Sequence, residues 1–410
     1  MSDKAARVYP SSGEAIIAQH LEELRRHRER GDLASEAAEL RDLGLLYQSQ
    51  GRLAEALRCH EEALRIHGEL HDAGRQADEL GNVAAVQYAS GDLAAAQSSL
   101  RAAQAMHHAQ QDALGEARDL GTLGLIARDQ GDLSRAMSHH RAALALHRGA
   151  GDLQGEANQL GNMALVHQVS GRLDEALRYH QGALAIYRQV GDRAGQARSL
   201  GNLAGIHHAR GDLAAAEESL RGALALHRAL GNRQGEASQL GNLGLVLRGR
   251  GNLEEARRHH QEALELHRAV GSRAGEADNL ANLGLIDLSA GDLAGAVGFL
   301  KAALEIYRRM GHRQGMATTM TNLGLAHQRR GELGLATYHL QQSLELHRRS
   351  GNRPGEVNAL INLGLISAQQ GARQEALDDL REARALLEEF HLDYGREVVE
   401  RALSELESDE

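Results

Sequence analysis

Histidine is the residue type in this sequence that first suggests chemistry, because there are 23 histidines and imidazole is the commonest metal ligand in proteins. Their spacing argues against a metal site. His140 and His147 are seven residues apart, which is about 10.5 Å along a helix, whereas two nitrogens on one zinc ion lie within about 4 Å of each other. The adjacent residues His259 and His260 point to different faces of a helix. We therefore expect core histidines, no metal site and no other cofactor.

Catalytic motifs are absent from the sequence. It contains no HExxH, GxxxxGK or GxSxG motif, and the recurrent GNLGL lies within a predicted helix rather than in a phosphate-binding loop. The one cysteine, Cys59, excludes an internal disulfide. We therefore predict a protein that is not an enzyme.

A ladder of asparagines is the main candidate for a binding site. An amide both donates and accepts hydrogen bonds, so it can hold the backbone of an extended peptide of any sequence. Neighbouring helices lie about 10 Å apart and an extended chain rises about 3.3 Å per residue. The ladder could therefore supply one asparagine for about every third peptide residue. Alternatively, the asparagines bind one another or nearby backbone and set the superhelical pitch. The ladder consists of Asn82, Asn162, Asn202, Asn242, Asn282, Asn322 and Asn362.

Two further rows accompany the ladder. Leucines at one repeated position could form an apolar groove floor or could simply be core residues. Arginines on the same helices could clamp acidic side chains or a terminal carboxylate, or could be solvated surface residues. The leucine row includes Leu245, Leu285 and Leu325. The arginines are Arg118, Arg128, Arg198, Arg248 and Arg329.

The elements that position these residues belong to an internal repeat of forty residues. Nine copies run without insertion or deletion from Gly31 to Phe390, a regularity that indicates a repeat array. In the copy Gly231–Val270, apolar residues at three-and-four spacing predict a first helix, Glu236–Arg250, and a second helix, Leu253–Ala269. A six-residue linker, Gly271–Glu276, is expected at the start of the next copy.

The ends of these helices have their own signals. Gly251 should end the first helix, because glycine accepts the left-handed conformation that follows a helix. Asn252 is the predicted N-cap of the second helix, where other copies carry aspartate. Four copies depart from this pattern and should have weaker caps, namely those with Arg52, Arg172, Glu332 and Ala372.

These positions together resemble the tetratricopeptide repeat. The resemblance is carried by Leu243-Gly244, Gly251, Ala256 and Ala263 with their equivalents, and covers about 90% of the chain. It implies an all-α, right-handed superhelix with a concave groove. The period of forty residues, rather than 34, is similar to Pins/LGN-type scaffolds, whose concave face holds an extended peptide, and to many bacterial repeat proteins. The resemblance also implies that His60, His140, His180 and His260 pack where such repeats carry a bulky residue.

Net charge and the distribution of apolar residues restrict the partners and the cellular location that the sequence allows. The net charge of −10 argues against a nucleic-acid partner. The N-terminus lacks the apolar core of a signal peptide, and no run approaches the roughly 20 apolar residues of a membrane helix. We therefore expect a cytoplasmic protein with no membrane contact.

The predicted organisation has four parts and one main function. Residues 1–12 form a disordered tail, 13–30 a capping helix, 31–390 the nine units, and 391–410 a capping helix with an acidic tail. The predicted function is a protein-interaction scaffold that binds an extended or helical segment of a partner protein. The alternatives are a regulatory or sensor module that controls a separate effector, and a structural array that self-assembles as a homo-oligomer through its end helices.

Overall fold

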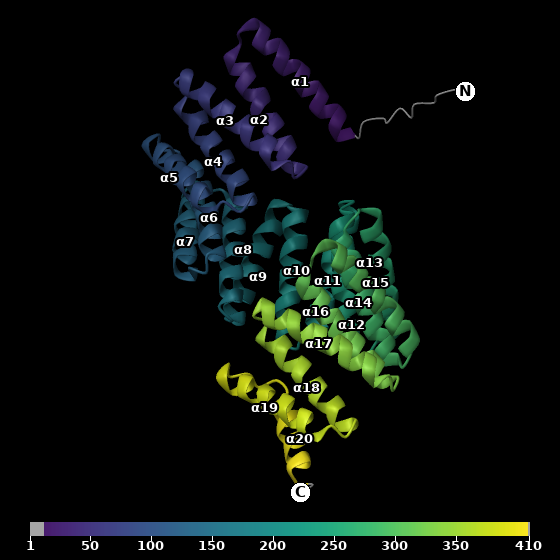
Figure 1. The fold of residues 1–410 in the computed structure, drawn as a ribbon. Coiled ribbons are helices and arrows are strands. Elements are labelled where there is room, and N and C mark those ends of the chain that lie inside the picture. Colours follow the sequence, from purple (N-terminus) through teal and green to yellow (C-terminus); the bar gives the residue numbers. More distant parts are fainter. Residues whose placement is uncertain (1–11, 409–410) are drawn as a thin grey trace, which may run out of the picture. The chain divides into compact units, whose positions relative to one another are not determined.

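The structure is a computed structural model that describes residues 12–408, and all its regular elements in that range are α-helices packed as consecutive helix–turn–helix pairs (Figure 1). The first helices of the pairs are α2 (Leu33–Ser49), α4 (Ala73–Ala89), α6 (Ala113–Asp129), α8 (Leu153–Val169), α10 (Arg193–Ala209), α12 (Arg233–Gly249), α14 (Arg273–Ala290), α16 (Arg313–Arg329) and α18 (Arg353–Gln369). The second helices are α3 (Leu53–Glu69), α5 (Leu93–Ala109), α7 (Leu133–Gly149), α9 (Leu173–Val190), α11 (Leu213–Ala229), α13 (Leu253–Ala269), α15 (Leu293–Met310), α17 (Leu333–Ser350) and α19 (Arg373–Glu389). This is the predicted all-α solenoid architecture.

One further helix lies on each side of the pairs. The N-terminal one is α1 (Ser12–Arg30), one residue longer than predicted, and the C-terminal one is α20 (Arg396–Ser408). Apart from Ser12, the predicted tail lies outside the described residues. The capping role of α1 and α20 stays a prediction.

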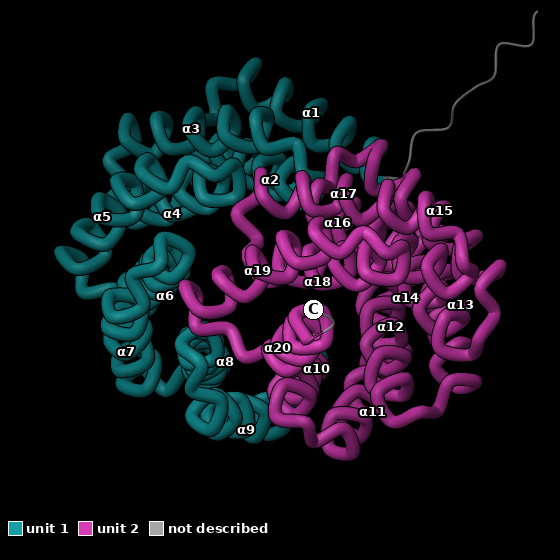
Figure 2. Tube along the Cα trace, turned by 60° about the horizontal axis from the view of Figure 1, so that its bottom comes forward, with its two compact units in different colours: residues 1–195 teal, residues 196–410 magenta. Residues whose placement is uncertain are grey.

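The chain divides into two compact units, which are described separately here (Figure 2). Unit 1 comprises residues 1–195 and unit 2 residues 196–410, so the boundary falls inside α10. Within each unit, helices that follow one another in sequence pack together, as α12 does on α11 and α13, and several successive first helices also touch, such as α4 with α6 and α12 with α14. Each groove described below is therefore built from helices that are close in sequence.

The turn between the two helices of a pair is only two or three residues long. In the central pair, Gly251 has φ of +81°, its backbone N–H donates to the carbonyl of Arg248 (3.0 Å), and the N–H of Asn252 donates to the carbonyl of Leu247 (2.9 Å). The left-handed glycine thus closes the last turn of α12, and this prediction is confirmed.

N-capping follows the sequence with one exception. The aspartates at this position cap their helices, as Asp92 does by accepting from the N–H of Ala95, whereas no side-chain cap bond forms at Arg52, Arg172, Glu332 or Ala372. Asn252 occupies the predicted N-cap position of α13, but its side chain makes no cap bond.

The six-residue linker is wrong, because only Val270, Gly271 and Ser272 separate α13 from α14. The first helices begin three residues earlier than predicted, at Arg233 in the central pair. The reason lies in the glycine of the first turn. Gly235 donates to the Oδ1 of the N-cap Asn232 (2.8 Å), and a methyl group on it would lie 2.3 Å from Nδ1 of His227. This glycine therefore allows close helix packing and does not mark a loop.

The interior of each pair depends on small residues that face large ones. Ala256 and Ala263 are fully buried, and a methyl group on Gly244 would lie 2.6 Å from the ring of His260. His60, His140, His180 and His260 are all at most 1% exposed. These four histidines are therefore packing residues, as predicted.

Candidate binding grooves

A groove of about 690 Å³ runs along the first helices of unit 2, from α12 through α14 to α16. It brings together Asn242, Asn282 and Asn322, one from each helix, with Leu245 and Leu285 beside them. We call it the unit 2 groove. Its other lining residues include Gln234, Ser238, Gly241, His267, Asp278, Asn279, Tyr307, His312, Gln314, Thr318 and Thr319.

The three asparagines of the unit 2 groove do not bind one another. Asn282 donates through Nδ2 to the backbone carbonyl of Asp278 (3.0 Å), one turn back in its own helix. The side chains of Asn242 and Asn322 make no hydrogen bond to any residue within 12–408. Two of the three amides therefore keep their full capacity to donate and accept.

The leucine row serves both of the roles considered above. Leu245 and Leu285 are half-buried and line the unit 2 groove, while Leu285 and Leu325 also pack against the core cluster that contains Leu300 and Leu323. Leu325 does not line the groove.

Asp278 supplies the one charged side chain among the residues that line this groove. Tyr307, which is 5% exposed, donates its hydroxyl hydrogen to Asp278, and burial together with this contact raises the pKa of Tyr307 above its usual value. The ring of His312 stacks on Tyr307 at 5.4 Å. Burial lowers the pKa of His267, which keeps that imidazole neutral at pH 7. The groove surface is therefore polar but nearly uncharged.

A buried histidine–amide pair lies beneath the unit 2 groove. Nδ1 of His260 is 2.9 Å from Oδ1 of Asn279, whose Nδ2 donates to the carbonyl of Gly275 (2.8 Å). Burial lowers the pKa of His260 to about 4, so the ring is neutral at pH 7. The orientation of Asn279 is thereby fixed by two hydrogen bonds.

Unit 1 has a smaller groove of about 350 Å³ that is rich in charge. We call it the unit 1 groove. Arg118 in α6 donates to Asp78 in α4 (2.9 Å), and Asn82 donates to Glu79 (3.1 Å). Its lining consists of Arg41, Leu45, His67, Arg75, Asp78, Glu79, Gly81, Asn82, Leu100, His107, Arg118, Asp119 and Thr122.

Two buried carboxyl groups form the base of the unit 1 groove. Asp119 is 3% exposed and lies 2.8 Å from Nδ1 of His107, and burial raises the pKa of Asp119 to about 6. Glu79 is 1% exposed and lies 2.9 Å from Nδ1 of His60. Charged partners here occupy the places that amides hold in unit 2.

The remaining predicted site residues line neither groove. They are Asn162, Asn202, Asn362, Leu325, Arg198 and Arg248. Asn362 donates to the backbone carbonyl of Asn358 (2.8 Å), as the alternative interpretation of the ladder expected. Arg248 is half-buried, which lowers its pKa.

Sequence analysis missed Tyr307, Asp278, His107 and Asp119. A signal existed for Tyr307 and His107, because each stands in the last turn of a second helix, where histidine or tyrosine recurs in most copies. Their partners are 29 and 12 residues away, and only the packing of the helices brings them together.

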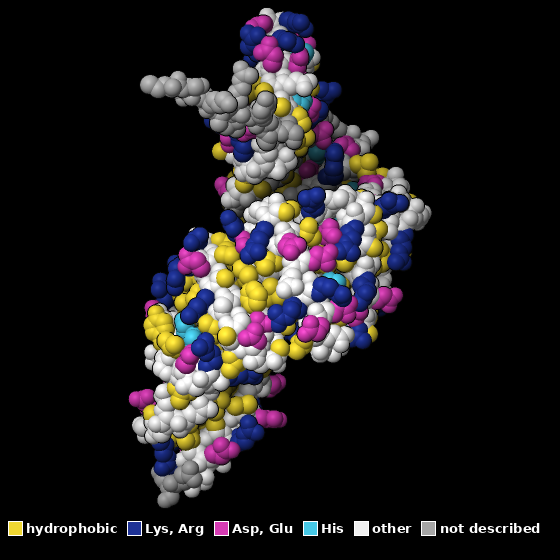
Figure 3. All heavy atoms as spheres, turned by 90° about the vertical axis from the view of Figure 1, so that its right-hand side faces the viewer, with side chains coloured by type: hydrophobic (Ala, Val, Ile, Leu, Met, Phe, Trp, Pro, Cys, Tyr) yellow, Lys and Arg dark blue, Asp and Glu magenta, His cyan; other side chains and the backbone are white. Residues whose placement is uncertain are grey.

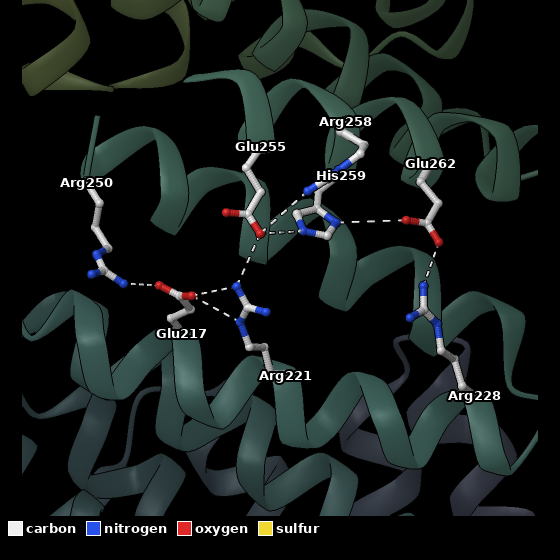
Figure 4. Close-up of polar contacts among 8 residues, drawn as sticks. All are labelled: Glu217, Arg221, Arg228, Arg250, Glu255, Arg258, His259 and Glu262. Atoms are coloured by element: carbon white, nitrogen blue, oxygen red, sulfur yellow. Dashed lines mark hydrogen bonds and ion pairs between the residues drawn. The ribbon is translucent and has the colours of Figure 1, made fainter. Parts of the chain in front are cut away.

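On the face drawn in Figure 3, basic and acidic side chains are interspersed rather than segregated. Between α11 and α13, Arg221 binds Glu217 and Glu255, and Arg228 binds Glu262 (Figure 4). Most of these side chains are substantially exposed, so they contribute little to stability individually.

Within residues 12–408, no group of three or more histidine, cysteine, aspartate or glutamate side chains is placed to hold a metal ion. None of the described helices combines the length and apolarity needed to cross a bilayer.

Comparisons with known proteins were informative for the fold. Family models described as tetratricopeptide repeat match residues 156–229, 236–309 and 315–389, which is more than half of the chain, and a second such model matches residues 40–74. A comparison with curated proteins returned no match. The finer resemblance to Pins/LGN-type scaffolds stays a prediction.

Several solved structures share the fold at low sequence identity. A signal transduction ATPase with a tetratricopeptide repeat sensor, from Pyrococcus horikoshii, has a TM-score of 0.63 and 15% identity over 88% of this chain and 55% of its own. The apo quorum sensor NprR from B. thuringiensis has a TM-score of 0.61 and 14% identity over 84% of this chain and 99% of its own. A Rap protein complexed with Competence and Sporulation Factor has a TM-score of 0.53 and 14% identity over 96% of this chain and 99% of its own.

Proposed function

The chain belongs to the tetratricopeptide repeat family, and from this premise we propose that it is a non-catalytic scaffold that binds an extended segment of a partner protein in the unit 2 groove. The observation that carries the proposal is the set of three groove asparagines, one per first helix, of which Asn242 and Asn322 have unsatisfied side-chain amides.

The geometry suits a peptide backbone. First helices that pack side by side lie about 10 Å apart, and three residues of an extended chain cover about the same distance. One asparagine can therefore bind the backbone at every third residue, from Asn242 to Asn322. Because the lining is nearly uncharged, these bonds do not depend on the ligand's net charge.

A sensor module that controls a separate effector is the second candidate. It is favoured by the names of two structural neighbours, a quorum sensor and an ATPase with a repeat sensor, although at this identity they share only the fold. Ligand-induced change of superhelical pitch would distinguish it. Small-angle scattering with and without a bound peptide should show a changed radius of gyration for a sensor and an unchanged one for a passive scaffold.

The peptide proposal is tested with an unbiased library of 12-residue peptides displayed on phage. We expect the chain to select binders, and the triple variant Asn242→Ala/Asn282→Ala/Asn322→Ala to bind them at least about 30-fold more weakly, since each lost amide removes hydrogen bonds worth about 0.5–1.5 kcal/mol each. Circular dichroism should show unchanged helicity.

The matched control for this test is Asn82→Ala/Asn162→Ala, which removes the same residue type from unit 1. It should leave affinity for the selected peptides within about twofold. Equal affinity of the triple variant and the unaltered chain would show that the ladder does not bind the ligand.

A further inference from the structure

A small slot of about 150 Å³ opens beside the unit 2 groove, between α10 and α12. We call it the Gly205 slot. Its lining is mainly apolar and consists of Gly201, Ala204, Gly205, His208, Leu220, Asn242, Leu245 and Val246.

The slot exists because one side chain is missing. Gly205 occupies the repeat position at which seven other copies have leucine and one has Ala85. A methyl group on Gly205 would meet no atom within 4 Å, and its φ is not positive. Neither close packing nor backbone geometry therefore requires glycine here, although glycine is among the least favourable residues inside a helix.

The size of the slot indicates what it holds. An apolar cavity of about 150 Å³ accommodates a molecule the size of benzene, so the slot fits one leucine, isoleucine, methionine or phenylalanine side chain. Asn242 and Leu245 line both the slot and the unit 2 groove. A segment bound along the groove can therefore place a side chain in the slot without leaving it.

Charge adds a second constraint on the ligand. Asp278 projects into the unit 2 groove and accepts a hydrogen bond from Tyr307, but no cationic side chain within residues 12–408 pairs with it. The equivalent residue in unit 1, Asp78, is paired with Arg118. A carboxylate without a cation, in a groove that is otherwise uncharged, favours a basic group on the ligand.

We propose that the segment bound in the unit 2 groove seats an apolar side chain in the Gly205 slot and a lysine or arginine at Asp278. This inference rests on the proposed function and names the ligand's chemistry. The slot lies between α10 and α12 and Asp278 is on α14, about one and a half helix spacings away. At about 10 Å per spacing and 3.3 Å per residue, the two side chains are four or five residues apart.

The test uses synthetic, fluorescein-labelled 14-residue peptides of serine, threonine and asparagine that contain one leucine and one arginine. The separation of the two residues is varied from two to eight, in both orders, and affinity is measured by fluorescence anisotropy. We expect the tightest binding at a separation of four or five, and a loss of about ten- to a hundredfold when leucine is replaced by serine. Replacing arginine by serine should weaken the affinity of the peptide about tenfold at low salt and by less at 1 M salt.

Two protein variants assign each preference to its site. Gly205→Leu fills the slot and should remove the preference for leucine while keeping that for arginine. Asp278→Asn, which can still accept from Tyr307, should have the reverse effect. Ala85→Leu is the matched control at the same repeat position in unit 1 and should change neither preference. Thermal melting of Gly205→Leu, expected to be unchanged or higher, shows that the variant folds.

The outcomes separate this inference from the proposed function. If the unbiased library yields binders that the asparagine triple variant loses, but neither an apolar nor a basic residue is enriched among them, the inference is overturned and the proposed function stands. If neither library nor panel binds, both are overturned. If Gly205→Leu binds the leucine peptides as well as the unaltered chain does, the slot is not the anchor site.

Discussion

The two grooves are built from equivalent repeat positions, yet the polar groups that line them have different partners. At one position unit 1 has Asp78 and unit 2 has Asp278, but the first is paired with Arg118, whereas the second contacts only Tyr307 among the groove side chains. Charges in unit 1 are thus compensated inside the protein. Among the described residues, the unit 2 groove leaves one carboxylate without a cationic partner and two side-chain amides without a hydrogen bond, which explains why we place the ligand there.

The buried row beneath the grooves shows the same contrast. Histidine contacts Glu79 and Asp119 in unit 1, but Asn279 in unit 2. A buried amide satisfies the histidine without introducing a charge, whereas a buried carboxyl must be either desolvated as an anion or protonated. The comparison therefore predicts that the buried groups beneath the two grooves contribute differently to the pH dependence of stability, whereas His140 of unit 1, which contacts Gln159, should behave like His260.

The largest effect should come from making unit 2 resemble unit 1. Asn279→Asp puts a carboxylate against the carbonyl of Gly275, where the amide now donates, and we expect a loss of about 3 kcal/mol in unfolding free energy at pH 7. Urea denaturation measures it. Asn279→Gln is the control, because Gln159 holds the equivalent histidine elsewhere, and it should cost less than half as much. A loss below about 1 kcal/mol for the aspartate variant would mean that water reaches this site.

The converse change in unit 1 should stabilise the protein. The pKa of Asp119 is about 6 in the folded state and 3.8 in the unfolded chain, so the native state binds more protons and loses stability as pH rises between these values. Asp119→Asn should therefore raise unfolding free energy by about 2 kcal/mol at pH 8 and by little at pH 4. His107, Asp78, Asp112 and Arg118 face this carboxyl or its partner, so the comparison is made at constant ionic strength.

If the unfolding free energy of Asp119→Asn varied with pH as that of the unaltered chain does, the raised pKa of Asp119 in the folded state would be contradicted. Such a result would show that the pKa of Asp119 is nearly the same in the folded and the unfolded chain.

The buried histidine of unit 2 should give a pH dependence of the opposite sign. The pKa of His260 falls from 6.5 to about 4 on folding, so its contribution is present above pH 6.5 and is lost as pH falls toward 4. His260→Leu copies Leu220 and Leu300 at the same repeat position. Between pH 7 and pH 5 this variant should lose about 1–2 kcal/mol less unfolding free energy than the unaltered chain does. The difference between urea midpoints at the two pH values measures this. An unchanged difference would show that His260 does not titrate within this range.

The smallest effect should come from the exposed ion pairs, which do not distinguish the grooves. Arg221→Ala removes contacts with Glu217 and Glu255, and we expect it to change unfolding free energy by less than about 1 kcal/mol. Peptide affinity in the unit 2 groove should not change. A larger loss that disappears in 1 M salt would show that the network between α11 and α13 acts cooperatively.

Much of the fold was predictable from the sequence because its signals are local and repeated. The period, the glycine that ends each first helix and the histidines at the core position all depend on residues within one copy, such as Gly251 and His260. The start of the first helix was missed because Gly235 suggests a loop, whereas it provides room for His227 of the preceding helix. That reason is visible only once the helices are packed.

The site was predictable only in part. The asparagine position was found from its recurrence, but the recurrence alone does not distinguish Asn242 and Asn322, which are unsatisfied, from Asn362, which binds its own helix. That difference depends on the neighbouring residue Asn358 and on side-chain direction. The contact between Tyr307 and Asp278 joins residues 29 positions apart, so it follows from the packing of α15 on α14.

The turns of two or three residues have a consequence for how the chain is made. They keep partners close in sequence, so that even a contact between successive first helices, such as Tyr88 with Asp129, joins residues only 41 positions apart. Local contacts favour rapid folding, and in repeat arrays each unit is stabilised mainly by its neighbours. A ribosome adds forty residues in a few seconds at about 5–20 residues per second. Each hairpin can therefore dock on the preceding one during translation, before the next copy has been synthesised.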